Sequence, residues 1–359
     1  MIRPPSPHAM ITTVALVAAL LFQTVAARKN LILDTDIFRN CDDAAALLLA
    51  ATSPDVKLLA VNLNSHSTYS VLAASAILSH YDHPHTPIGA RRPLTNDSFF
   101  DAHHFSLGEF ASKIARHWSA GSLPWGEAHK AHDPVALYRQ ALAASEDGSV
   151  SIVSLAFLHN LAGLLDSPAD AHSDLPGPDL IAAKVSELVV MGGRYPSGHE
   201  FNFYADDPAT TAHVINNWPG RMVFSGADLG QSVMSGDRLV AEGPPGDPVR
   251  AAYIYCAHGD PRPSWDPITV LYAIRGLSDI FEYANRRGYN HVEPDGSNAW
   301  VDDENVRNQH WLRLKLGNDT VAAELDRLYL EAAWIADNPL VGAGLSWRHH
   351  RPIFPKPDL

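Results

Sequence analysis

The sequence predicts an α/β fold in a single large domain, with a doubly wound, mostly parallel central sheet flanked by helices. Two observations support this prediction. From Lys29 onward, short apolar runs alternate with segments of helical pattern, an order typical of parallel sheets. Hydrophobic residues make up 46% of the 359 residues, which is enough for a sizeable core. Ligands of such folds bind beyond the carboxyl ends of the strands, so the polar residues that follow each strand are functional candidates.

Each expected strand is a short, compact apolar run bounded by polar residues. The expected strands are 30–33, 57–64, 151–155, 187–191 and 221–224. The expected helices lie around them, and the first begins with two acids, which suit a helix N-terminus. These helices are 42–51, 69–80, 134–144, 160–165, 208–216 and 267–275.

Two segments break this alternation. Residues 91–132 contain several histidines together with Trp118 and Trp125, and we expect a lid or insertion there. Either tryptophan could cover a bound ligand, but hydrophobic anchoring is the more common role of a tryptophan in such a loop. Residues 281–316 are rich in Tyr, Asn, Asp and Trp, and we expect them to add a small hairpin element.

The first 27 residues have the pattern of a secretory signal peptide. Arg3 precedes an apolar run, 10–22, and the small residues from Val25 to Ala27 offer a cleavage site. A buried N-terminal helix is the alternative, but the flanks of this short run favour export. We therefore expect a secreted mature domain of residues 28–359, with no membrane association after cleavage.

The composition favours a small substrate over a nucleic-acid polymer. The chain has 40 acidic residues against 27 Lys and Arg, and the resulting net charge of −13 repels a polyanion. Two Asn-x-Ser/Thr sites, at Asn96 and Asn318, fit a glycosylated exported protein if the host is eukaryotic. Only Cys41 and Cys256 are present, so no disulfide framework is expected, and the sequence leaves open whether they pair.

Four carboxylates lie close together where the first expected strand ends and the first helix begins. They are Asp34, Asp36, Asp42 and Asp43. Carboxylates this close repel one another unless a cation neutralises them. Because all the donors are hard oxygens, they select Ca²⁺ or Mg²⁺ over zinc.

This cluster has other interpretations. Asp42 and Asp43 could simply suit the N-terminus of a helix. An EF-hand is excluded, because Phe38 and Arg39 stand where that loop needs an oxygen ligand and a glycine. A metal-dependent phosphatase of the haloacid-dehalogenase type stays open, since such enzymes also carry Asp-x-Asp after a first strand.

Further motifs follow the acidic cluster in a fixed order. They are Asn64 after the second strand, the run from Leu155 to Leu161, Met191-Gly192-Gly193 with Glu200-Phe201-Asn202, and Trp265-Asp266-Pro267. Together with Asp34-Thr35-Asp36 and Asp42-Asp43-Ala44, this order resembles the inosine–uridine-preferring nucleoside hydrolase family of Ca²⁺-dependent nucleoside N-ribohydrolases. The resemblance extends from Asn30 to about Gly276 and implies cleavage of the N-glycosidic bond of a small-molecule nucleoside.

The resemblance also implies roles for individual residues. Ca²⁺ would be bound by the carboxylates of Asp36, Asp43 and Asp266 and by the backbone carbonyl of His159. Asp42 would be the general base, and Asp34 would support the loop. The ribose hydroxyls would be held by Asn64, Glu200, Asn202 and Asp266, with Met191, Phe201 and Trp265 contacting the substrate. A homo-oligomer is compatible with the sequence, which does not fix the number of subunits.

The chain departs from the family in ways that affect substrate choice and turnover. Many members carry His where Trp265 stands, and an indole can stack on a purine and favour its protonated ring, so we expect purine nucleosides. The loop 37–41 is longer than in the best-known members, and Asn40 replaces an acid. The Asn that commonly precedes the Glu-Phe-Asn motif is not recognisable in 194–199. These changes keep open an alternative function, a catalytically impaired member that acts as a secreted ligand-binding protein.

Overall fold

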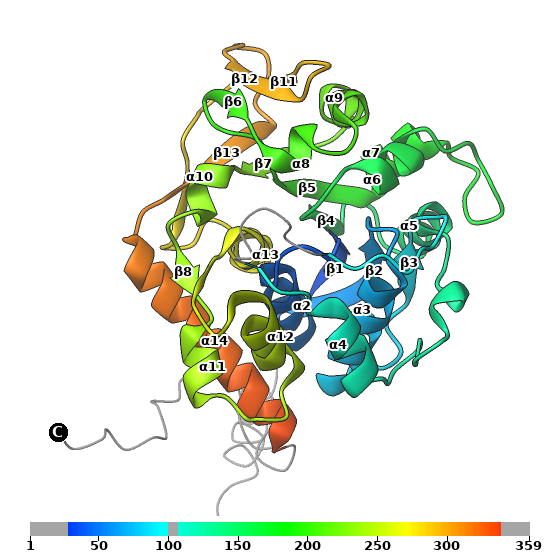
Figure 1. Ribbon diagram of the computed structural model, residues 1–359. Coiled ribbons are helices and arrows are strands. Elements are labelled where there is room, and N and C mark those ends of the chain that lie inside the picture. The colour runs from blue at the N-terminus through cyan, green and yellow to red at the C-terminus, as the bar shows by residue number, and fades with distance from the viewer. Residues whose placement is uncertain (1–27, 100–106, 339–359) are drawn as a thin grey trace, which may run out of the picture.

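The central sheet of the computed structural model contains eight strands in the order β10-β13-β7-β5-β4-β1-β2-β3 (Figure 1). The structure describes residues 28–99 and 107–338. All neighbouring strands of this sheet pair in parallel except β10 and β13, so the predicted fold class is confirmed. The strands are β1 (Lys29–Thr35), β2 (Val56–Leu63), β3 (Ile88–Ala90), β4 (Val150–Ser154), β5 (Val185–Met191), β7 (Met222–Ser225), β10 (Phe281–Tyr283) and β13 (Gln309–Leu314).

The strand order reverses at β1. From β1 the chain first builds outward through β2 to β3, and then returns to the other side of β1 to add β4, β5 and β7. A parallel sheet opens a crevice at such a reversal, because the connections after the two neighbouring strands lead to opposite faces. The carboxyl ends of β1 and β4 therefore mark the expected binding position.

Helices cover both faces of the sheet (Figure 1). One face is covered by α2 (Asp42–Thr52), α3 (Thr68–His80), α12 (Pro248–Ala257), α13 (Trp265–Arg275) and α14 (Asn318–Asp337). The other face is covered by α5 (Pro134–Ala143), α6 (His159–Leu165), α7 (Gly177–Lys184) and α9 (Pro208–Asn217). All six predicted helices and all five predicted strands are present, with ends shifted by a few residues.

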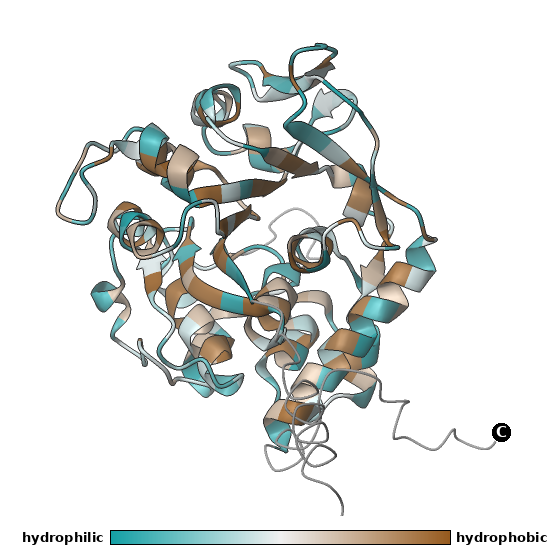
Figure 2. Cartoon of the chain, turned by 180° about the vertical axis from the view of Figure 1, so that it is seen from behind, coloured by the Kyte–Doolittle hydropathy of each residue, from teal (hydrophilic) through white to brown (hydrophobic). Residues whose placement is uncertain are grey.

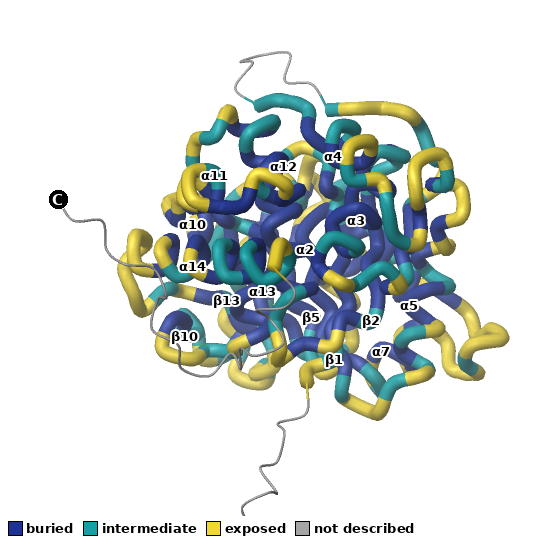
Figure 3. Tube along the Cα trace, turned by 90° about the horizontal axis from the view of Figure 1, so that it is seen from below, coloured by how far each residue is buried: buried dark blue, intermediate teal, exposed yellow. Residues whose placement is uncertain are grey.

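Burial follows this layering. In β1, Leu31 and Leu33 pack into the core on the side of α2, whereas Ile32 packs on the side of α5. The strands in the middle of the central sheet are mostly apolar, while the outer helices alternate apolar and polar along their length (Figure 2). Residues 42–51 of α2 are buried all round, which places this helix in the interior, and exposed segments lie at the periphery (Figure 3).

Three helices begin with the same dipeptide. Asp133, Asp207 and Asp247 each cap a helix whose first residue is proline, and each side chain accepts a hydrogen bond from the backbone of the first turn. The dipeptide Asp266-Pro267 is placed differently in its helix, because α13 begins at Trp265, two residues before the proline. Asp266 therefore lies inside the first turn, and its carboxylate is not the cap.

The two segments that break the alternation have different structures. Within 91–132, α4 (Ala111–His117) packs on α3, and η1 (Ala128–Lys130) follows it. The indole of Trp118 donates to the carbonyl of Gly246 (2.7 Å), and Trp125 stacks on Tyr69, so both tryptophans anchor the segment. Residues 100–106 of this segment lie outside the described residues, and its role as a lid stays a prediction.

The hairpin expected within 281–316 is confirmed. It is formed by β11 (Tyr289–Val292) and β12 (Ser297–Val301), and β6 (Ser197–His199) completes a small antiparallel sheet with it. A second small sheet pairs β8 (Met234–Ser235) with β9 (Arg262–Pro263). The remaining short helices are α8 (Phe201–Tyr204), α10 (Ala227–Gly230) and α11 (Asp237–Glu242).

Within residues 28–99 and 107–338, every helix is too short or too polar to span a bilayer. The signal peptide predicted for residues 1–27 lies outside the described part of the chain.

Candidate functional site

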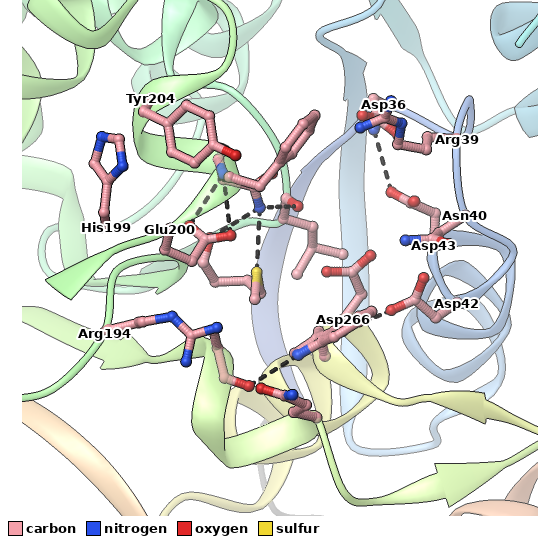
Figure 4. A pocket seen from close by; sticks show the side chains of 17 residues that line it. Asp36, Arg39, Asn40, Asp42, Asp43, Arg194, His199, Glu200, Tyr204 and Asp266 are labelled. Atoms are coloured by element: carbon pink, nitrogen blue, oxygen red, sulfur yellow. Dashed lines mark hydrogen bonds between the residues drawn. The ribbon is translucent and has the colours of Figure 1, made fainter. Parts of the chain in front are cut away.

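A cavity of about 380 Å³ opens at the carboxyl ends of the central strands (Figure 4). Its lining comes from the connections after four strands: Asp36 follows β1, Leu155 follows β4, Met191 ends β5 and Ala227 follows β7. Acidic residues from the β1–α2 connection and α13 lie across the cavity from Glu200, Arg194 and Tyr204. The polar lining is thus concentrated at the strand ends, where the fold predicts a ligand.

Three buried carboxylates converge on the acidic side of this cavity. Oxygen atoms of Asp42, Asp43 and Asp266 all lie within 4.8 Å of one another. Asp42 and Asp43 are the first two residues of α2, and Asp266 comes from the first turn of α13, which packs against α2. Asp36 also lines the cavity, and its backbone N–H donates to Asp43 (3.3 Å).

Hydrogen bonds orient these carboxylates. The Thr35 hydroxyl and the Asp36 amide both donate to one oxygen of Asp43. The backbone N–H of Asp266 donates to Asp42 (3.4 Å). These contacts tie β1, α2 and α13 together at one point.

Burial makes the charged forms of these acids unfavourable. It raises the pKa of Asp42 to about 7, and the charge of Asp43 adds to this effect. Burial and the neighbouring aspartates also raise the pKa values of Asp36 and Asp266 well above their usual range. The charged forms are therefore disfavoured twice, because burial removes the carboxylates from water and because the carboxylates repel one another.

This donor set fits a hard divalent cation. All the donors are carboxylate oxygens, which Ca²⁺ and Mg²⁺ prefer, and their separation allows one ion to contact several of them. A cation at this point would cancel the repulsion that raises the pKa values. The sequence predicted Asp36, Asp43 and Asp266 as metal ligands; the structure brings Asp43 and Asp266 together with Asp42 and places Asp36 beside Asp43.

The loop between β1 and α2, residues 36–41, has an unusual backbone. Ile37 is fully buried and has a φ of 45°, a conformation that β-branched residues rarely adopt and that costs about 1–3 kcal/mol. The Ser70 hydroxyl donates to the Ile37 carbonyl (3.0 Å), and Arg262 donates to the Asn40 side chain (2.8 Å). Contacts from α3 and from the segment after α12 thus hold this loop in place.

Glu200 and Asn202 face the acidic cluster from the other side of the cavity. Glu200 is largely buried, which raises its pKa to about 7, and its carboxylate accepts from the backbone N–H groups of Gly193 and Asn202. The amide nitrogen of Asn202 donates to the carbonyls of Leu155 (3.0 Å) and Met191 (3.2 Å). The amide oxygen of Asn202 is therefore the atom left to accept a hydrogen bond from a ligand.

Aromatic rings complete the lining. The indole nitrogen of Trp265 donates to the Ala227 carbonyl (2.8 Å), which fixes the plane of the ring. Phe201 is 37% exposed, and the Arg39 guanidinium lies 4.5 Å from the centre of its ring. Tyr204 stacks on His199 with ring centres 4.3 Å apart. Together they provide flat apolar surfaces opposite a charged wall.

Two predicted site residues do not line the cavity. Asn64 is 1% exposed; its amide donates to Asp34 and its side-chain oxygen accepts from the Asn160 N–H (3.4 Å). The imidazole of His159 lies near Asp206 (3.5 Å), at the start of α6. This placement gives no support to a ribose contact for Asn64, and the backbone role of His159 stays a prediction.

Asp34 lies outside the lining of the cavity, and its expected role in supporting the loop stays a prediction. It is fully buried and accepts hydrogen bonds from Tyr138 (2.7 Å), from Asn160 (3.1 Å) and from Asn64. Burial raises its pKa to about 7 despite these donors.

Several lining residues were not predicted from the sequence. They are Arg194, Tyr204, Ala227 and Gln231. Ala227 lies two residues after β7, where the strand-end rule would have found it, and Gln231 follows at the end of α10. Arg194 and Tyr204 flank the Glu-Phe-Asn motif without any chemical signature of their own.

The raised pKa values predict how the metal-free protein responds to pH. Asp34, Asp42 and Glu200 bind protons more tightly when folded than when unfolded, so their contribution to stability is full at low pH and is lost as pH rises through about 7. With a chelator present, we expect the melting temperature to fall between about pH 5 and pH 8. Differential scanning calorimetry measures the melting temperature across this range, and a melting temperature that stays constant or rises with pH would contradict the prediction.

A matched pair of variants tests the repulsion among the three buried aspartates. In the metal-free protein near neutral pH, Asp266→Asn should raise the melting temperature, because it removes one of the converging charges. The same variant should lose the stabilisation that added calcium gives the parent protein. Asp260→Asn, at an exposed position, is the control and should change neither property. Calcium stabilisation retained by Asp266→Asn would remove Asp266 from the metal site.

The sequence pattern of the inosine-uridine preferring nucleoside hydrolase family matches residues 31–326. No curated protein matches the chain. Among solved structures, a plant nucleoside hydrolase, PpNRh1, is 18% identical, with a TM-score of 0.62 over 84% of this chain and 99% of its own. A purine-preferring ribonucleoside hydrolase from Gardnerella vaginalis is 16% identical, with a TM-score of 0.62 over 86% and 99%.

The effector protein XOO4466 is also similar, at 14% identity with a TM-score of 0.57 over 90% of this chain and 99% of its own. At such low identities these structures show the shared fold, while the match over residues 31–326 shows the family. This family match leaves the metal-dependent phosphatase alternative without support. The chain belongs to the inosine-uridine preferring nucleoside hydrolase family, and is thus a hydrolase of N-glycosyl bonds in nucleosides.

Proposed function

We propose that this nucleoside hydrolase is a secreted, calcium-dependent N-ribohydrolase that prefers purine ribonucleosides and releases ribose and the free base. One observation carries the proposal: the buried carboxylates of Asp42, Asp43 and Asp266 converge within 4.8 Å, on the side of the cavity that faces Glu200 and Asn202. A metal-neutralised acidic wall opposite hydrogen-bond acceptors suits a polyhydroxylated sugar.

Calcium is the proposed cofactor because the site offers several carboxylate oxygens and has room for further ligands. Ca²⁺ accepts about six to eight oxygens, so that protein, water and sugar hydroxyls can share it. When bound, it supplies positive charge that neutralises the aspartates, polarises water and holds the hydroxyls in place. Asp36, Asp43 and Asp266, with the His159 carbonyl, are the proposed ligands.

The opposite wall orients the sugar. Glu200 is fixed by hydrogen bonds from Gly193 and Asn202, and it keeps acceptor capacity for a hydroxyl. The amide of Asn202 is fixed by Leu155 and Met191. Because these acceptors are held before the substrate enters, little conformational freedom is lost when the ribose binds.

Asp42 is the proposed general base. Burial raises its pKa to about 7 when no cation is bound, so its carboxylate is a stronger base than an ordinary aspartate. The Asp266 N–H donates to one of its oxygens, which orients the carboxylate toward the cluster. A neighbouring cation would lower this pKa and keep the carboxylate ionised.

Trp265 is the proposed contact for the leaving base. It lines the cavity, and its indole plane is fixed by the hydrogen bond to Ala227. A fixed indole stacks on a purine and favours the partly positive ring that develops as the bond to ribose breaks. A purine presents a larger stacking surface than a pyrimidine, which motivates the proposed preference.

Export is proposed from the pattern of residues 1–27. The two Asn-x-Ser/Thr sites are consistent with it, since both Asn96 and Asn318 are exposed. The substrate would then be nucleosides outside the cell.

A second candidate function is a ligand-binding protein with little turnover. It is motivated by Asn40, which stands where an acid is expected and is engaged by Arg262 (2.8 Å). The effector protein XOO4466 has a similar fold. Measurements of base release and of calcium binding separate the two candidates.

Replacing Asp42 tests the assignment of the base. Asp42→Asn should lower the rate of base release from inosine about 10²-fold or more, because proton transfer by a positioned group contributes on this order. Calcium binding should persist, as measured by isothermal titration calorimetry. Free base is followed by chromatography, with and without chelator.

Asp43→Asn is the matched variant at the next residue and should lose calcium binding together with activity. If Asp42→Asn loses calcium instead, Asp42 is a ligand and Asp36 becomes the base. If the parent protein binds calcium but releases no base from inosine, guanosine, adenosine or uridine, the binding-protein alternative replaces the enzyme.

Replacing Trp265 tests the purine preference. Trp265→Ala should lower kcat/KM for inosine and guanosine by about tenfold or more, because stacking of a base on an aromatic ring contributes about 1–3 kcal/mol. The loss for uridine should be smaller, and Trp265→Phe should restore part of the purine activity. Trp125→Ala, which lies outside the cavity, is the control. Equal losses for all nucleosides would remove Trp265 from base selection.

Expression of the full chain tests export. In a secreting host we expect the protein in the medium with a mature N-terminus at Arg28, as determined by N-terminal sequencing. A chain that begins at residue 28 should stay inside the cell. Retention of the full chain with an intact leader would overturn the proposed localisation without affecting the proposed reaction.

A further inference from the structure

Cys41 and Cys256 are far apart in the sequence but meet behind the acidic wall of the cavity. Both are fully buried, and both are free thiols in the structure. Cys41 directly precedes Asp42 at the N-terminus of α2, while Cys256 lies in the last turn of α12, which packs against α2. The Cys41 thiol lies within hydrogen-bonding reach of Cys256.

The segment around Cys256 contacts the β1–α2 loop more than once. Arg262 donates to Asn40, the neighbour of Cys41. Tyr253, one turn before Cys256, is close enough for the charges of Cys41 and Asp42 to act on its hydroxyl. The backbone carbonyl of Cys256 accepts from the N–H of Gly108 (2.7 Å), which fixes this end of α12 in turn. Residues 253–262 thus lie next to two neighbouring positions of the loop, Asn40 and Cys41.

This loop needs to be held. It contains Ile37 in a left-handed conformation, and it leads into carboxylates that repel one another when no cation is present. Without a restraint, repulsion favours movement of the loop away from α13. A covalent bond at Cys41 would act at the residue next to the cluster.

We propose that Cys41 and Cys256 form a disulfide bond that joins the β1–α2 loop to α12 and holds the aspartates in position. The inference rests on the proposed export, because an exported chain meets oxidising conditions. Each thiol gives up one proton and one electron, a sulfur–sulfur bond forms, and a disulfide oxidant such as glutathione disulfide is cleaved to two thiols.

Burial determines when this bond forms. Neither sulfur is exposed in the folded protein, so oxidants cannot reach the folded dithiol and it reacts slowly. The bond therefore forms during folding, before α12 and α2 close over it. Once formed, it is shielded from reductants unless the protein unfolds.

The test is a thiol count under denaturing conditions. The full chain is taken from the medium of a secreting host, and a second preparation, made in a reducing cytosol, is refolded with reduced and oxidised glutathione. Both are unfolded, alkylated and digested, and the peptides are weighed by mass spectrometry. We expect no alkylated cysteine and one peptide pair linked through Cys41 and Cys256, lighter by two hydrogen atoms than the free peptides.

A variant gives a second readout. Reducing and refolding the parent protein without oxidant should lower its melting temperature by roughly 5 °C, while Cys256→Ser should melt at the same temperature with and without reductant. Full alkylation of both cysteines in both preparations would overturn the inference. A linked protein that releases no base would overturn the proposed function alone, and an active protein with two free thiols would overturn the disulfide alone.

Discussion

Repulsion among buried carboxylates is the constraint on which the rest of this structure depends. Asp42, Asp43 and Asp266 lie within 4.8 Å although burial raises the pKa of each. In water such charges would separate. Here packing opposes their separation, because α2 is buried on all sides and packs against both the sheet and α13. The apolar core thus holds a charged constellation that becomes favourable once a divalent cation is bound, and the fold and the chemistry of the site depend on the same packing.

The sequence predicts the parts of this arrangement that are local. The Asp36-to-Asp43 cluster is visible because its members are neighbours in the chain, and parallel-sheet topology places the end of β1 at the reversal of strand order. Asp266 is different. The dipeptide Asp266-Pro267 has the same form as three true helix caps, and no local pattern distinguishes it. In the sequence, only the order of motifs along the chain identified Asp266 as a site residue. In the structure, its carboxylate is free to face the cavity because α13 begins at Trp265.

Other features could not be predicted because they depend on which groups are left after packing. Asn64 follows a strand and carries a suitable amide, but its hydrogen bonds go to the buried Asp34 and to the backbone of Asn160. Trp118 and Trp125 belong to a polar segment that could have covered the cavity, yet their rings anchor α4 and α3. The sequence shows that buried amide and indole groups need hydrogen-bond partners. Only the tertiary structure determines which groups those partners are.

The lining of the cavity also bears on how the base leaves. His199 is a histidine in the lining; its imidazole stacks on Tyr204 and its Nε2 contacts the Asp295 carbonyl (3.0 Å), so a proton for a substrate would have to come from Nδ1. Trp265 also lines the cavity, and an indole has no acidic proton to give. Activation of the leaving group would then come from stacking, which stabilises a positive ring, rather than from a protein acid. Such a mechanism favours bases that take up a proton readily and present a large flat surface, which is the basis of the proposed preference for purines.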